Sequence, residues 1–123
     1  MGTHGRLRLI EAFAKAWTAR DLDALMEMMS EHPEFRASVG PEPGRTFSGR
    51  DEVRSGFEQF LGGRGPEPEA VPEPTLVCED FAVTRWRLRW PDEDASPDVH
   101  GCDVFEFDGD RISLKDTFRK VDG

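Results

Sequence analysis

The sequence contains no tyrosine, only two cysteines and few basic residues. Its 16 Lys and Arg residues stand against 25 Asp and Glu residues, which gives a formal net charge of −9. Because binding to nucleic acids and to anionic membranes depends on a basic surface, this balance argues against both kinds of partner. No hydrophobic run has the length of a signal peptide or a membrane span. With two thiols and no such segment, we expect a protein of the reducing cytoplasm.

Nine phenylalanines and three tryptophans supply apolar mass in a chain of which 33% is charged. A chain of 123 residues buries about two-thirds of its unfolded surface when it folds. We therefore expect one domain over residues 1–123. Residues 1–5 are expected to be disordered. Residues 62–74 are rich in Pro, Gly and Glu, which predicts a connector within the domain.

Apolar residues recur at helical spacing in three segments, and the first of them places Phe13 and Trp17 on one stripe. Asp21 is placed to cap the second segment, and His32-Pro33 to end it. Gly62-Gly63 ends the third. The predicted helices cover residues 6–19, 22–30 and 50–61.

Alternating apolar and polar residues predict strands that follow the helices. The last two strands meet at a tight turn at Asp108-Gly109. Because the longer strands are separated from the helices along the chain, the pattern predicts an α+β domain in which antiparallel strands curl over the helices. The predicted strands cover residues 34–39, 45–47, 75–79 and 81–90, with the final pair within residues 99–118.

An acid on an otherwise apolar strand face is the one local pattern that suggests chemistry. Asp103 alternates in step with Phe105 and Phe107. If these side chains face a pocket, Asp103 could donate a proton or a hydrogen bond to a ligand carbonyl, or act as a general acid or base. It could equally be held by neighbouring donors in a polar corner of the fold.

A second acid, Asp116, alternates in step with Phe118 on the last strand. If Asp116 also faced inward, the two carboxyls could share a proton. A single bulge in this strand would instead turn Lys115 and Thr117 inward. Asp103 and Asp116 are the two candidate catalytic residues.

The aromatic residues are candidates both for the core and for a ligand pocket, because core side chains line a pocket enclosed by a curved sheet. No His, Cys, Asp or Glu cluster has metal-ligand spacing, so neither a metal nor another cofactor is expected. Cys102 and Val104 make the opposite face of the strand apolar, which predicts a twofold partner there. The candidate ligand-binding residues are Phe13, Trp17, Trp86, Leu88, Trp90, Phe105 and Phe118.

Three segments together resemble the nuclear transport factor 2-like superfamily, and within it the SnoaL-like group. Residues 16–25 (AWTARDLDAL) are similar to the junction of its first two helices, and residues 47–53 (FSGRDEV) to the entry of its third. Residues 101–112 (GCDVFEFDGDRI) are similar to its penultimate hairpin. The resemblance implies a cone, in which a curved antiparallel sheet wraps around three N-terminal helices and encloses a pocket. It also implies a homodimer formed through the outer face of the sheet.

Members of this group include ketosteroid isomerases, polyketide cyclases, dehydratases and non-enzymatic binding modules. Asp103 matches the Asp of the isomerase oxyanion hole, but Phe13 stands in place of its Tyr. The isomerase base would fall at Ala37 or Ser38, neither of which is a base. The resemblance therefore implies binding of a small, mostly apolar molecule and not standard steroid isomerisation.

If the protein is an enzyme, we expect cofactor-free acid–base isomerisation, cyclisation or dehydration. The alternative is a non-catalytic binding module or a dimeric interaction module.

Overall fold

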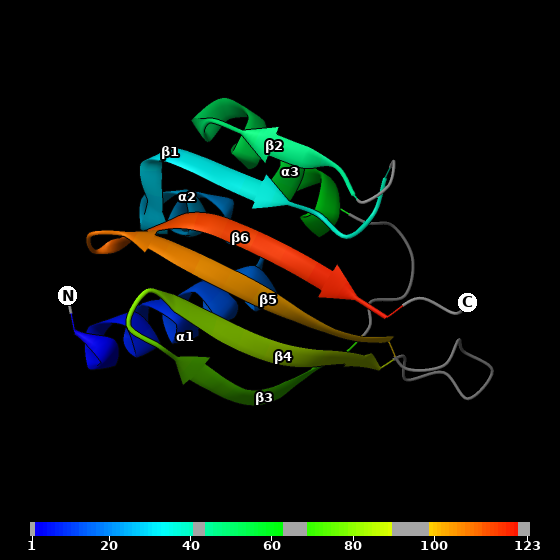
Figure 1. The fold of residues 1–123 in the computed structure, drawn as a ribbon. Coiled ribbons are helices and arrows are strands. Elements are labelled where there is room, and N and C mark those ends of the chain that lie inside the picture. Colours follow the sequence, from blue (N-terminus) through cyan, green and yellow to red (C-terminus); the bar gives the residue numbers. More distant parts are fainter. Residues whose placement is uncertain (1, 41–43, 63–68, 90–98, 121–123) are drawn as a thin grey trace.

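The computed structural model describes residues 2–40, 44–62, 69–89 and 99–120. Three helices lie behind one face of a sheet (Figure 1), which confirms the α+β class. None of the helices in these ranges is long and apolar enough to cross a bilayer. The elements are α1 (Thr3–Ala19), α2 (Leu22–Met28), β1 (Met29–Arg36), β2 (Thr46–Ser48), α3 (Arg50–Leu61), β3 (Glu69–Val77), β4 (Phe81–Arg89), β5 (Val99–Asp108) and β6 (Arg111–Arg119).

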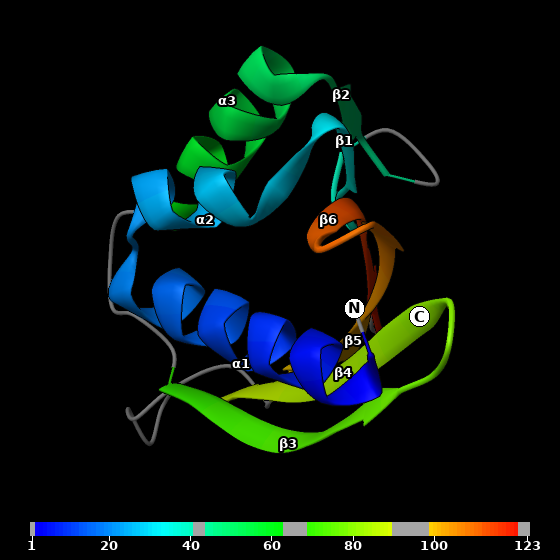
Figure 2. The ribbon, with the colours of Figure 1, turned by 90° about the vertical axis from the view of Figure 1, so that its left-hand side faces the viewer.

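The six strands form one sheet in the order β2-β1-β6-β5-β4-β3. Strands β3 to β6 form the predicted antiparallel meander. Strand β1 runs parallel to β6, with Arg36 opposite Asp116, so the sheet is mixed and not wholly antiparallel. Figure 2 shows the sheet bending around α1, with β3 on one side of this helix and β6 and β1 on another.

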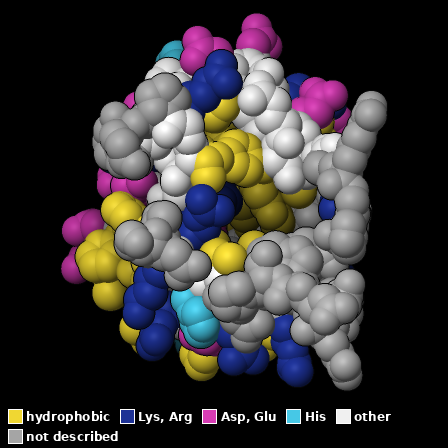
Figure 3. Space-filling view, turned by 90° about the vertical axis from the view of Figure 1, so that its right-hand side faces the viewer, with side chains coloured by type: hydrophobic (Ala, Val, Ile, Leu, Met, Phe, Trp, Pro, Cys, Tyr) yellow, Lys and Arg dark blue, Asp and Glu magenta, His cyan; other side chains and the backbone are white. Residues whose placement is uncertain are grey.

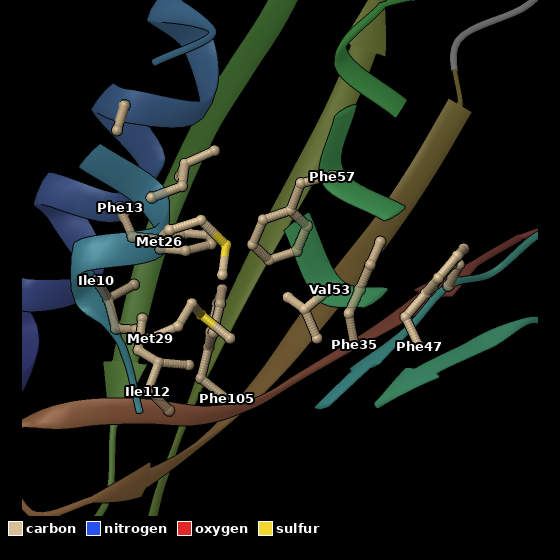
Figure 4. Close-up of a cluster of buried hydrophobic side chains, with 14 residues drawn as sticks. Ile10, Phe13, Met26, Met29, Phe35, Phe47, Val53, Phe57, Phe105 and Ile112 are labelled. Carbon is tan, nitrogen blue, oxygen red and sulfur yellow. The ribbon is translucent and has the colours of Figure 1, made fainter. Parts of the chain in front are cut away.

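The core lies between the three helices and the concave face of the sheet (Figure 4). Phe13 of α1 is at its centre, with its ring centroid 5.6 Å from that of Phe105 on β5 and 5.9 Å from that of Phe57 on α3. Met29 and Ile112 are fully buried beside them. Burial of each such side chain contributes about 1.5–3 kcal/mol to folding, so this cluster fixes the helices against the sheet.

Helix α1 begins at Thr3, three residues before the expected start at Arg6. The Arg6 amide donates to the Gly2 carbonyl over 3.1 Å, and its guanidinium donates to the Glu79 carbonyl. These two bonds hold the first turn, so residues 3–5 are helical and the expected disorder is not found there.

Two strands begin earlier than predicted. Strand β1 starts at Met29 and contains Pro33, because its register with β6 shifts between Met29 and Glu34 and the irregular stretch accommodates the proline. Strand β3 starts at Glu69, inside the expected connector. It is an edge strand whose register with β4 shifts between Pro72 and Thr75. Prolines are tolerated at such positions because no second neighbour needs their missing N–H.

Arg50 joins the start of α3 to the end of α2. Its guanidinium donates to the carbonyls of Met26 (2.9 Å), Met29 (3.1 Å) and Ser30 (2.9 Å). The last carbonyls of a helix have no partner within the helix. Arg50 therefore closes the C-terminal end of α2 and fixes the turn into β1.

Candidate functional site

The facing of the last strand is set by a bulge. Phe107 of β5 lies opposite Ile112, whereas Glu106 lies opposite Leu114, so Ser113 is an extra residue in β6. The extra residue reverses the alternation. Lys115 and Thr117 therefore share the inner face with Asp103, which is the alternative that the sequence left open.

Asp103, Lys115 and Thr117 form a closed hydrogen-bonded cluster on that face, which we call the polar cluster. Lys115 Nζ donates to Asp103 Oδ1 over 3.1 Å and to Thr117 Oγ1 over 2.9 Å. Thr117 Oγ1 donates to Asp103 Oδ1 over 2.5 Å. The side chains of Lys115 and Asp103 are only 7% and 12% exposed, so this is a buried ion pair.

Aromatic rings surround the ammonium of Lys115. Its Nζ lies 4.5 Å from the ring centroid of Trp17 and 5.0 Å from that of Phe35. A cation at this distance is attracted to the negative face of a ring. The two rings are also in contact with Phe57, at 5.3 Å and 5.0 Å. The polar cluster is thus bordered by the aromatic core.

The cluster lies toward a hollowed end of the molecule. Trp17 is in the last turn of α1, Thr117 is near the end of β6, and Asp103 is in the middle of β5. Strand β5 begins and β6 ends on the right of Figure 1. Figure 3 views that end and shows a hollow with hydrophobic side chains at its floor and Lys or Arg side chains beside it. Trp17 and Thr117 are half-buried. We call this feature the hollow.

Asp116 and Phe118 face away from the polar cluster, contrary to the expected alternation, because of the bulge at Ser113. Asp116 Oδ2 lies 3.6 Å from Arg36 Nη1 on the outer face of the sheet. Burial raises the pKa of the Asp116 carboxyl above its ordinary value, and the charge of Arg36 opposes this shift. Phe118 is 52% exposed on the same outer face.

Of the other candidate ligand residues, Trp86, Leu88 and Phe105 lie on the inner face of the sheet. Phe13 and Phe105 are almost fully buried in the core. Trp86 and Leu88 are half-buried on β4. Trp86 lies opposite Gly101, where a Cβ atom would come within 2.4 Å of the indole ring, so the indole lies against the glycine. Trp90 lies outside the described residues.

The outer face of the sheet exposes several large apolar side chains, with Leu76 65%, Phe81 41% and Phe118 52% exposed. Val83 and Cys102 contribute to the same face and help to line a groove of about 400 Å³ there. Burial raises the pKa of the Cys102 thiol, which favours its neutral form. The charged and imidazole side chains that line this groove are Glu73, Arg85, His100, Arg119 and Lys120. Glu73 Oε2 lies 3.6 Å from Arg85 Nε.

Within the described ranges, no group of three or more His, Cys, Asp or Glu residues could hold a metal ion. The polar groups that meet at the polar cluster are an ammonium, a hydroxyl and a single carboxylate. This set suits hydrogen bonding and proton transfer.

Sequence reasoning singled out Asp103 and Trp17 but gave no role to Phe35. A signal for Lys115 was present, because Lys115 and Thr117 share one alternation of the strand. That signal could be used only with knowledge of the bulge. Phe35 comes to the cluster through the parallel pairing of β1 with β6, where it lies opposite Lys115.

Comparison with known proteins places these features in a family context. The profile of the SnoaL-like domain matches residues 10–114. No curated protein matches the chain. Among solved structures, a nuclear transport factor 2-like protein of unknown function from Mesorhizobium loti has a TM-score of 0.80 and 21% identity, covering 97% of this chain and 93% of its own.

Two further solved structures are similar in fold. Bal32a, from a soil-derived mobile gene cassette, has a TM-score of 0.79 and 19% identity and covers 95% of this chain and 90% of its own. A protein from Kribbella flavida, named a candidate ketosteroid isomerase, has a TM-score of 0.75 and 14% identity and covers 98% and 82%. At these identities the likeness shows the nuclear transport factor 2-like fold.

Proposed function

Since this chain belongs to the family of SnoaL-like domains, we propose that it binds a small, mostly apolar molecule in the hollow. The apolar body of this molecule would contact Trp17 and its aromatic neighbours. Its polar group would meet the polar cluster. A pocket lined by aromatic side chains with a few convergent polar groups is the usual form of a small-molecule site.

The buried ion pair between Asp103 and Lys115 is the observation on which the proposal depends. Removing two charges from water costs several kcal/mol for each ion, and apolar residues at such positions are often as stable or more stable. An ion pair inside an aromatic core is therefore a poor device for stability alone. Its place beside the hollow, with Trp17 and Thr117 half-buried, supports a role in ligand binding.

Chemical-shift mapping with 2-naphthol as the probe tests the proposal. We expect shifts of the amide signals of Asp103, Lys115 and Thr117 and of the indole N–H of Trp17. Shifts confined to Cys102 and Phe118 would place the binding on the outer face and contradict the proposal. The Trp17→Ala variant should weaken binding, whereas Ala12→Lys, on the exposed side of α1, should not.

Acid–base catalysis at Asp103 is a second candidate function. The carboxylate is held as an ion pair, so it accepts hydrogen bonds, whereas the isomerase oxyanion hole needs an acid that donates one. The arrangement favours Asp103 as a base over the neutral acid considered from the sequence. A base in this position would take a hydroxyl proton from the ligand and allow a solvent proton to add at carbon.

Exchange of the C1 proton of 2-naphthol in D2O measures this reaction. The hydroxyl proton passes to Asp103, a deuteron adds at C1, and the original C1 proton is then lost. Catalysis requires exchange faster than in buffer and its loss in the double variant Asp103→Val with Lys115→Met, which keeps the interior neutral. Exchange at the buffer rate would leave binding without catalysis as the function.

We further propose that the protein forms a twofold dimer through the outer face of the sheet. The exposed Leu76, Phe81 and Phe118 support this, because a monomer rarely leaves such an apolar patch uncovered.

A further inference from the structure

The polar cluster can be examined for hydrogen-bonding capacity that its own members do not use. A lysine ammonium has three donors, and a threonine hydroxyl has one. Lys115 uses one donor on Asp103 and one on Thr117, while the rings of Trp17 and Phe35 border its remaining side. Thr117 uses its hydroxyl proton on Asp103. Two of the three Lys115 donors and the Thr117 hydroxyl thus have hydrogen-bond acceptors within the cluster, and the third Lys115 donor faces the two rings.

The acceptors are not all used. Both bonds to Asp103 end on Oδ1. No hydrogen bond reaches Oδ2 from any side chain in the described part of the chain. An ionised carboxylate can accept about four hydrogen bonds over its two oxygens. The side chain is 12% exposed, so Oδ2 can meet a molecule that enters the hollow.

We infer that the molecule bound in the hollow presents a hydrogen-bond donor, a hydroxyl or an N–H group, to Asp103 Oδ2. This inference rests on the proposed function and names its ligand class. A carbonyl facing Oδ2 would set its lone pairs against those of the carboxylate. The site therefore selects alcohols, phenols and amines, or amides through their N–H, and disfavours the ketones expected from the isomerase comparison.

Four compounds that share one apolar body can test this selection: naphthalene, 2-naphthol, 2-methoxynaphthalene and 2-acetylnaphthalene. Only 2-naphthol can donate. A hydrogen bond to a charged partner contributes about 1.5–3 kcal/mol, so 2-naphthol should bind roughly tenfold to a hundredfold more tightly than 2-methoxynaphthalene. Equilibrium dialysis at pH 7 gives the four dissociation constants.

The variant that removes the acceptor must keep the fold. Asp103→Asn alone would leave the Lys115 charge buried without its counter-ion. The double variant Asp103→Val with Lys115→Met replaces both charges by apolar groups and keeps the interior neutral. Asp116→Asn is the matched control, because this acid lies on the outer face of the same sheet.

The outcomes separate the inference from the proposed function. A preference of tenfold or more for 2-naphthol, lost in the double variant and kept in Asp116→Asn, supports the inference. Equal or tighter binding of 2-acetylnaphthalene would overturn the inference and leave binding in the hollow intact. A preference for 2-naphthol that persists in the double variant would likewise overturn the inference and leave binding in the hollow intact. If none of the four compounds binds at its solubility limit, the proposed function fails, and the inference fails with it.

Discussion

Lys115 Nζ and Asp103 Oδ1 lie 3.1 Å apart on neighbouring strands, with both side chains buried on the concave face of the sheet. Thr117 bonds to both of them. The pair is therefore largely shielded from solvent, and each charge depends on the other. This dependence makes their separate and joint removal informative.

Removing one member of the pair should destabilise the protein far more than removing both. Lys115→Met leaves the Asp103 carboxylate buried without a counter-ion, which should lower the free energy of unfolding by about 3–5 kcal/mol. The double variant Asp103→Val with Lys115→Met should recover most of this loss. Urea unfolding followed by tryptophan fluorescence measures the free energy of unfolding of the single variants and the double variant. A loss in the double variant equal to the sum of the losses in Asp103→Val and Lys115→Met would show that the charges do not interact.

The pH dependence of stability should report Asp116. Its pKa is raised by burial, so the folded state holds the proton more tightly than the unfolded state. The stabilisation of the folded state by the protonated Asp116 carboxyl is complete below the unfolded pKa of about 3.9. It is lost as the pH rises through the pKa of the folded state. Asp116→Asn should therefore gain stability relative to the wild type as the pH rises from about 4 toward 7.

Urea unfolding of both proteins across that pH range gives the comparison. A relative stability of Asp116→Asn that falls with rising pH would mean that the ion pair with Arg36 outweighs the burial of the carboxyl.

Phe118 should control association. Phe118→Lys places a charge among the exposed apolar side chains of the outer face, so we expect it to convert a dimer into a monomer. Light scattering coupled to size-exclusion chromatography at micromolar concentration measures the mass. Ala12→Lys adds the same charge on the exposed side of α1 and should leave the mass unchanged. A wild-type protein that elutes as a monomer would refute the dimer.

Arg50 should contribute more to stability than Arg54 on the same helix. Arg50→Met removes three hydrogen bonds to backbone carbonyls at the end of α2, which should cost about 1–3 kcal/mol. Arg54→Met removes only an ion pair with Asp23, which is 82% exposed, and should cost about 0–1 kcal/mol. Thermal unfolding of the two variants provides the comparison, and a larger loss for Arg54→Met would be inconsistent with the role given to Arg50.

The sequence was most informative where structure depends on local signals. Helix α3 has the predicted ends, because Gly49 and Gly62 flank an amphipathic segment. Asp103 faces inward as predicted, because β5 alternates without interruption from Gly101 to Glu106.

Features that depend on distant partners could not be predicted in the same way. The bulge at Ser113 exists because β6 must pair with β5 on one side and with β1 on the other, and nothing local to Ser113 announces it. The facing of Lys115, Asp116 and Phe118 follows from that one residue. The first part of β3, from Glu69 to Pro74, was missed because prolines are unfavourable in a strand except at the edge of a sheet, and a position at the edge is a property of the whole fold.

The parallel pairing of β1 with β6 has a consequence for how the protein is made. Met29 lies opposite Ile112, about 80 residues later in the chain, and such distant pairing forms late in folding. A ribosome that has not yet released residues 111–119 holds α1, α2 and β1 with the apolar side chains of Leu25 and Phe35 uncovered. We therefore expect nascent chains to engage chaperones until β6 emerges. Arrested chains of increasing length should become resistant to protease only after that point.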